Sequence, residues 1–195
     1  DLKDAPIFFF KASTLSNVSM KSLAVHIGSQ LLELSPYKSA YEKIAEMTRY
    51  LRSTGHEISH LDLGGGLGIP YSDESLADLN AYNQIILETV GDLDCKLSIE
   101  PGRYLVGEAG MLITRVIYIK QGEQKKFVIV DGAMNDLIRP TLYDGFHAIV
   151  PVTEKNLSSQ KSLCDVVGPI CESGDYFAKD RMLPEVSQND LLAIT

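Results

Sequence analysis

The stretch LDLGGGLGIPY, residues 61–71, places three consecutive glycines directly after a short apolar run. Each glycine held in regular structure costs about 0.5–1 kcal/mol, because glycine loses more backbone freedom on folding than other residues. Two familiar phosphate-binding motifs do not fit: the dinucleotide fingerprint fails at Ile69, and the P-loop pattern lacks its Gly-Lys-Ser/Thr. The run therefore predicts a glycine-rich turn after a parallel strand, where backbone N–H groups can receive an anion. A tight turn with nothing bound is the alternative.

The segments around the glycines alternate between helix and strand patterns. Residues 35–55 carry apolar side chains at helical spacing, with Pro36 near the start and Gly55 at the end, and a second helix is predicted over 76–91. Strand-like segments are KSLAVHIGS (21–29), HLDLGG (60–65) and CKLSIEPGR (95–103). This order predicts right-handed βαβ units and a parallel sheet.

The pattern changes to short strands after about Tyr104. Residues 109–132 predict a β-hairpin that turns at 121–123, and further strand candidates are 147–154, 162–170 and 190–195. The fold class is thus α/β followed by mostly β, divided into residues 1–106 and 107–195. The first part supplies only about three βα units, whereas a closed (β/α)8 barrel needs roughly 250 residues. We therefore expect the chain to be a segment of a longer protein.

Composition limits the kinds of partner. Eighteen basic and 26 acidic residues give a net charge of −8, which argues against nucleic acid or an anionic membrane surface. The three cysteines form no CxxC pair, so we expect neither a disulfide framework nor a zinc knuckle, and a cytoplasmic location. HEISH (56–60) matches the zinc-protease pattern, but that pattern requires a helix and Gly55 ends the helix just before it, so no metal site is predicted.

Polar or glycine-bearing clusters end the three predicted parallel strands. They are HIGSQ (26–30), GGGLG (64–68) and EPGR (100–103). If the strands are adjacent, the three clusters meet at the carboxyl edge of the sheet, where α/β folds place ligands. Arg103 can bind a phosphate with two hydrogen bonds, and Ser29 can donate a third. Glu100 supplies an anion and His26 a flat ring, although a single histidine is more often structural.

These clusters, with NDLIRPTLY (135–143) and CESGD (171–175), closely resemble the fold-type III, alanine-racemase-like pyridoxal-phosphate decarboxylases, and in particular their diaminopimelate branch. The resemblance covers essentially the whole chain. It implies that residues 1–106 are part of a pyridoxal-phosphate-binding (β/α)8 barrel and that residues 107–195 are part of a β-rich domain. It also implies a carboxy-lyase that converts meso-2,6-diaminopimelate to L-lysine and CO2, the last step of lysine biosynthesis.

The resemblance also implies roles for individual residues. Those that would bind the cofactor are His26, Ser29, Gly64, Gly65, Gly66, Glu100, Gly102 and Arg103. Among the catalytic residues, His26 would stack on the pyridine ring, Glu100 would face the pyridine nitrogen, and Cys171 would return a proton to the substrate carbon. Those that would bind the distal head of the substrate are Arg103, Arg139 and Tyr143, at its carboxylate, and Glu172, at its ammonium. From the residues alone, Cys171 reads as a buried strand-end thiol, and Arg139 and Glu172 could equally be solvated charges.

The same resemblance implies a homodimer, because the family segment that matches Cys171–Glu172 reaches the partner subunit's barrel. No lysine here lies in the strand-end context of the family's Schiff-base lysine, so we expect the segment alone to be inactive. Two alternatives stay open. One is a related decarboxylase acting on ornithine, arginine or carboxynorspermidine, and the other is a non-catalytic remnant that binds pyridoxal phosphate.

Overall fold

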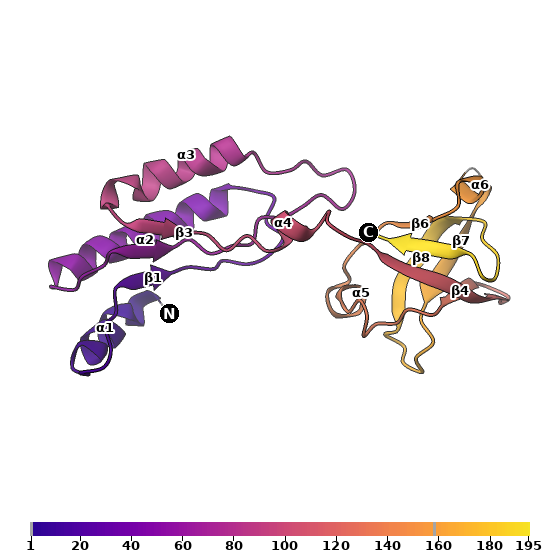
Figure 1. Ribbon diagram of the computed structural model, residues 1–195, viewed down its shortest axis with the longest axis horizontal. Coiled ribbons are helices and arrows are strands. Elements are labelled where there is room, and N and C mark those ends of the chain that lie inside the picture. The colour runs from indigo at the N-terminus through magenta and orange to yellow at the C-terminus, as the bar shows by residue number, and fades with distance from the viewer. Residues whose placement is uncertain (1, 158) are drawn as a thin grey trace. The chain divides into compact units, whose positions relative to one another are not determined.

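Three parallel strands lie side by side in the first half of the chain, as the alternating pattern predicts (Figure 1). They are β1 (Ser22–Ala24), β2 (His60–Asp62) and β3 (Lys96–Ser98), in the order β1-β2-β3. Backbone hydrogen bonds continue past the short ladders: the Val25 N–H donates to Asp62 O at 2.9 Å, and the Glu100 N–H donates to Gly64 O at 2.7 Å. The carboxyl ends of the strands are therefore held next to one another.

The computed structural model describes residues 2–157 and 159–195, and it divides into two compact units, residues 1–107 and 108–195. The helical elements of the first unit are η1 (Leu2–Asp4), α1 (Ala5–Ser13), α2 (Ser35–Ser53), α3 (Leu79–Val90), η2 (Gly91–Leu93) and α4 (Arg103–Val106). In the described part of the chain, no helix is both long and apolar enough to cross a membrane.

Helix α2 buries one face, because its apolar side chains recur every three or four residues. The buried residues are Tyr37, Tyr41, Ile44, Ala45, Thr48 and Leu51. Helix α3 begins at Leu79 rather than at residue 76 as predicted, because Asp78 caps it by accepting a hydrogen bond from the Asn80 N–H at 2.8 Å. Together the two helices cover the sheet with a core that continues through Leu61 and Leu63.

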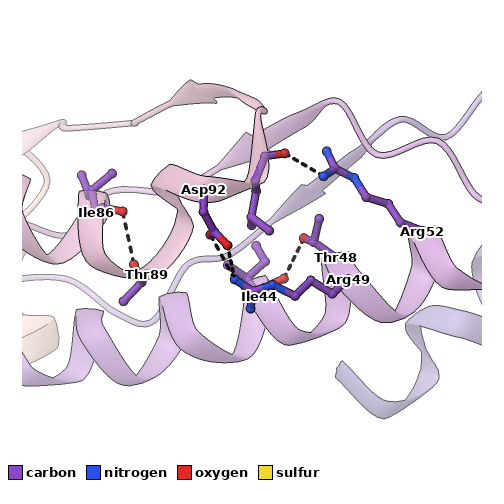
Figure 2. A network of polar contacts seen from close by, with 8 residues as sticks. Ile44, Thr48, Arg49, Arg52, Ile86, Thr89 and Asp92 are labelled. Carbon is purple, nitrogen blue, oxygen red and sulfur yellow. Dashed lines mark hydrogen bonds and ion pairs between the residues drawn. The ribbon is translucent and has the colours of Figure 1, made fainter.

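Polar contacts on α2 and around η2 complete this packing (Figure 2). Arg49 and Asp92 form an exposed ion pair at 3.0 Å, a kind of contact that contributes at most about 1 kcal/mol. Arg52 has a more specific role, because it donates to Ile58 O before β2 and, at 2.6 Å, to Leu93 O before β3. One side chain at the end of α2 thereby ties together the segments that lead into two neighbouring strands.

The second unit contains one six-stranded sheet with the order β6-β9-β4-β5-β7-β8. Its elements are β4 (Leu112–Gln121), β5 (Lys126–Val130), α5 (Arg139–Tyr143), β6 (Ile149–Pro151), α6 (Glu154–Leu157), β7 (Lys161–Val167), β8 (Tyr176–Pro184) and β9 (Leu191–Ile194). The predicted hairpin is present as β4–β5, but its loop spans residues 122–125, slightly later than predicted, and is closed by the Gly122 N–H donating to Lys125 O at 2.8 Å.

Two features of this sheet were not predicted. Strand β8 carries charged residues in its middle, which break the alternation that marks a strand, and it pairs antiparallel with β7. Strands β5 and β7 pair in parallel, although the segment between them contains α5, β6 and α6. The outer strands β6 and β8 contact each other, so the sheet curls round a core that includes Val116, Val166 and Leu192.

Candidate functional site

The glycine run lies where three backbone segments come very close together. A Cβ atom added to Gly64 would lie 2.0 Å from Val25 O, and one added to Gly65 would lie 2.0 Å from Glu100 O. Gly64 also has a φ of +69°, a conformation that other residues rarely adopt. The groups that exclude side chains here are therefore the backbones of the neighbouring strand ends. Whether or not an anion binds, the close approach of these strands requires the glycines.

Two tyrosines of helix α2 hold this turn by donating hydrogen bonds to backbone carbonyl groups of the turn. The Tyr37 hydroxyl donates to Gly65 O at 3.3 Å, and the Tyr41 hydroxyl donates to Leu63 O at 3.1 Å. On the amide side, the Gly64 N–H donates to Asp62 Oδ1 at 2.9 Å. A phosphate at this turn would have to displace that bond before it could use the Gly64 amide.

Because these tyrosines are buried, we expect the folded protein to lose stability at alkaline pH. Burial, reinforced by the charge that Tyr82 would carry, raises the pKa of Tyr37 to about 12. In the unfolded chain the Tyr37 phenol ionises near pH 10. The contribution of Tyr37 to the stability of the folded protein is therefore complete below pH 10 and is lost as the pH rises toward 12. We expect Tyr37→Phe to remove on the order of 2 kcal/mol of this alkaline loss, measured as the free energy of unfolding of the complete protein between pH 9 and 12. Equal pH dependence in the wild type and the variant would contradict the assignment.

The strand ends also bring together the side chains predicted to bind a cofactor. His26, Ser29 and Glu100 are exposed on the segments that follow β1 and β3. Arg103 is half-buried and begins α4, directly after Gly102. Since the strands are adjacent, a cation, a hydroxyl, an imidazole and a carboxylate occur at one edge of the sheet. The predicted adjacency of the three strand ends is confirmed.

Sequence reasoning missed two residues at this edge. The Arg103 guanidinium donates to Gln30 Oε1 at 2.9 Å, and its Cζ lies 5.9 Å from the centre of the Tyr71 ring. Gln30 directly follows Ser29 in HIGSQ, so its place in that cluster was the available signal. Its partners lie 39 and 73 residues away along the chain, and no local pattern indicates them.

In the second unit, the helix with Arg139 and Tyr143 contacts the loop with Cys171 and Glu172. Thr141 Oγ1 donates to Gly174 O, and the Tyr176 hydroxyl donates to Pro140 O at 3.2 Å. Tyr143 at the end of α5 is 72% exposed. The Arg139 guanidinium instead lies along its own loop, where it donates to Phe146 O at 2.9 Å and contacts His147 Nε2 at 3.3 Å.

The loop between β7 and β8 presents an exposed thiol beside a carboxylate that stays ionised. Cys171 is exposed, whereas burial raises the pKa of the Cys164 thiol. The Gly174 N–H and, secondarily, the Ser173 hydroxyl donate to Glu172 and lower its pKa. A negative charge at neutral pH is what a ligand ammonium group requires.

The anchor of this loop is Asp175, a residue that sequence reasoning did not select. Its side chain is 4% exposed and accepts hydrogen bonds from the Met134 N–H at 2.7 Å and from the Ile170 N–H at 2.6 Å. A buried carboxylate with two backbone donors is a strong local constraint. It joins the loop after β5 to the loop that carries Cys171.

The HEISH segment is not helical: β2 begins at His60, and His60 Nε2 contacts Ser98 Oγ at 2.9 Å. Within residues 2–157 and 159–195, no group of three or more histidine, cysteine or acidic side chains is placed to hold a metal ion. The helical geometry that the zinc-protease pattern requires is therefore missing from this segment.

Comparison with known proteins identifies relatives along almost the whole chain. The family model for the pyridoxal-dependent decarboxylase C-terminal sheet domain matches residues 13–195. A diaminopimelate decarboxylase of Neisseria meningitidis serogroup A is 47% identical over 191 residues, which are 98% of this chain and 46% of the relative. This chain thus spans about half the length of the curated relatives that it matches.

Solved structures share the fold. A crystal structure from Aquifex aeolicus superposes with a TM-score of 0.94 at 40% identity, covering 100% of this chain and 48% of that one. The Helicobacter pylori diaminopimelate decarboxylase complexed with L-lysine superposes with a TM-score of 0.90 at 44% identity, covering 99% and 48%.

Proposed function

This chain belongs to the pyridoxal-dependent decarboxylases, and from that membership we propose that the complete protein converts meso-2,6-diaminopimelate to L-lysine and CO2. The observation that carries the proposal is the likeness to diaminopimelate decarboxylases along nearly the full chain. One of these relatives has been solved with L-lysine, the proposed product, bound.

The residues at the edge of the first sheet fit pyridoxal phosphate. We propose that Ser29, Arg103 and the backbone of Gly64, Gly65, Gly66 and Gly102 hold its phosphate. A Cβ at Gly102 would meet nothing within 4 Å, so this backbone is open to a ligand. His26 would lie against the pyridine ring, and the Glu100 carboxylate would face the pyridine nitrogen. When bound, the cofactor supplies an electron sink for the carbon that loses CO2.

The chain's own groups would complete the reaction. Cys171 would transfer the proton on its Sγ to the substrate carbon that has lost CO2, a role for which an exposed thiol is accessible. Glu172 would bind the distal ammonium of the substrate, and its lowered pKa supports that role. We propose that these two residues act at the site of a partner subunit in a homodimer.

Residues 1–106 would be part of a (β/α)8 barrel. The free state of the three cysteines supports a cytoplasmic location.

Arg139 is the proposed selector of substrate. Diaminopimelate carries a distal carboxylate that ornithine lacks, and a guanidinium binds a carboxylate through two parallel hydrogen bonds. Tyr143, on the same helix as Arg139, would bind the same carboxylate. Arg103 would also bind a substrate carboxylate. Binding requires Arg139 to exchange its contacts with Phe146 and His147 for the substrate.

We expect Arg139→Ala to lower kcat/KM for meso-diaminopimelate roughly tenfold to a hundredfold, because a charged hydrogen bond contributes about 1.5–3 kcal/mol. Steady-state assays of the complete enzyme measure this. Arg115→Ala is the matched control, since Arg115 is an exposed arginine of the same unit that bonds to Asn189 O. Faster turnover of ornithine, arginine or carboxynorspermidine than of diaminopimelate would replace the proposal with one of those substrates.

The visible spectrum of the purified complete protein tests the cofactor. An absorption band that borohydride bleaches reports a lysine Schiff base, and release of CO2 from diaminopimelate would then establish the activity. Bound pyridoxal phosphate without a Schiff base would favour the non-catalytic alternative, whereas no band after addition of pyridoxal phosphate would contradict the cofactor assignment.

A further inference from the structure

We propose that Gln30 is a positioning residue that holds the Arg103 guanidinium in place to receive an anion. The inference rests on the proposed function, in which Arg103 binds the cofactor phosphate and the distal carboxylate of the substrate. It adds a residue that touches neither group but acts through Arg103.

The Gln30 side-chain amide connects all three strand ends. Its Nε2 donates to Ile69 O at 2.5 Å, and its Oε1 accepts from the Ile69 N–H at 3.3 Å and from Arg103 at 2.9 Å. Gln30 ends the cluster after β1, Ile69 follows the glycine run after β2, and Arg103 ends the cluster after β3. One side chain thus joins the two anion-receiving parts of the proposed site, the glycine turn and the arginine.

The backbone around Gln30 is shaped for this arrangement. Gln30 has a φ of +60°, an uncommon conformation for a residue other than glycine, asparagine or aspartate. A Cβ added to Gly68 would lie 3.1 Å from Gln30 C and 3.2 Å from Gln30 Cδ, so Gly68 leaves room for the amide. Strain held by surrounding structure is characteristic of functional positions.

The main chain holds this turn without help from the amide. The Leu31 N–H donates to Gly66 O at 2.9 Å, and the Gly68 N–H donates to Leu31 O at 3.0 Å, which forms a parallel bridge between Leu31 and Leu67. The strand ends therefore stay paired when the Gln30 side chain is shortened. The consequence specific to Gln30 is the position of Arg103.

An amide is suited to this task because its oxygen is neutral. A carboxylate in the same place would also anchor Arg103 but would offset the positive charge that an incoming anion needs. A neutral acceptor restricts the long side chain, so less conformational entropy is lost when the anion binds. This is why glutamine is suited to orient an arginine that must remain available.

The test uses the complete protein with Gln30→Ala, Arg103→Lys and the double variant. The dissociation constant of pyridoxal phosphate and the KM for meso-diaminopimelate are both measured. If Arg103→Lys raises the dissociation constant or the KM, Gln30→Ala should raise the same constant about tenfold, while kcat changes less than about threefold. In the Arg103→Lys background, Gln30→Ala should add less than about twofold, because the two residues act as one unit. Gln84→Ala, an exposed glutamine of α3 that bonds to Glu88, is the matched control.

Gln30→Met, which keeps the length of the side chain without its polar atoms, replaces Gln30→Ala if that variant does not fold, and the same increase is expected. Equal values for Gln30→Ala and Gln84→Ala would overturn the inference. So would additive effects of Gln30 and Arg103, since they would mean that Gln30 acts without Arg103. If the wild type does not turn over diaminopimelate, the proposed function fails, but the affinity for pyridoxal phosphate still tests the coupling of Gln30 with Arg103.

Discussion

Replacing Gly65 by alanine should prevent the complete protein from folding normally. The new methyl carbon would lie 2.0 Å from Glu100 O and 2.9 Å from Glu100 C. These are backbone atoms of a segment that is hydrogen-bonded to Gly64 O, so they cannot rotate away as a flexible side chain can. We expect a loss of about 4 kcal/mol or more, which is at the upper end for a single substitution. Soluble yield and the thermal unfolding midpoint measure it.

Gly91→Ala is the matched control for Gly65→Ala. Gly91 belongs to the same unit, its φ is −63°, and a Cβ added there lies 3.9 Å from Leu87, an ordinary contact. The control should change stability by less than about 1 kcal/mol. A Gly65→Ala protein that unfolds within about 3 °C of the wild type would show that the strand ends do not approach each other this closely.

Replacing Asp175 by alanine should destabilise the second unit and disable the loop that carries Cys171 and Glu172. The change removes the buried acceptor of two part-buried hydrogen bonds, from the N–H groups of Met134 and Ile170, and a donor left without its partner costs up to about 1–3 kcal/mol. We therefore expect a loss of about 3–5 kcal/mol in the free energy of unfolding. Decarboxylation should fall further than stability alone explains, because the loop loses its fixed position.

Two further variants make the Asp175 experiment specific. Asp175→Asn keeps one acceptor oxygen, so its loss of stability should be intermediate. Asp92→Ala removes an exposed carboxylate that pairs with Arg49, and it should cost less than about 1 kcal/mol. If Asp175→Ala were as mild as Asp92→Ala, in denaturant unfolding and in activity, the loop would not depend on its buried carboxylate.

The elements predicted well are those whose signal is local. The spacing of Tyr37, Tyr41, Ile44 and Leu51 predicted α2, and Pro36 marked its start. The helix ends at Ser53, two residues before the predicted end at Gly55. The three strands and the adjacency of their ends followed from the alternation of helix and strand patterns. Strand β8 was missed because its middle is charged, and the parallel pairing of β5 with β7 was missed because it joins segments that are distant in the sequence.

In the candidate site, too, residues in short motifs were predicted, whereas residues whose role depends on distant contacts were not. The residues selected from the sequence lie in short motifs, and their assignment to a cofactor and a substrate depends on a family resemblance. Gln30 and Asp175 were not selected, although each lies inside a quoted motif, because their partners are distant: Arg103 is 73 residues from Gln30, and Met134 is 41 residues from Asp175. A motif shows that a polar residue is present but does not show which distant group it contacts.

The amino-acid sequence by itself determined which segments become α2, α3 and the three strands of the first unit, and that glycines and polar side chains gather at three strand ends. Periodicity and turn chemistry act over a few residues, so they can be read along the chain. Only the tertiary structure decided why the glycines are needed, how Gln30 reaches Arg103, and that Asp175 anchors the loop of Cys171. These depend on how closely distant backbones approach, because steric exclusion and hydrogen bonding are set by distances in space rather than by separation in sequence.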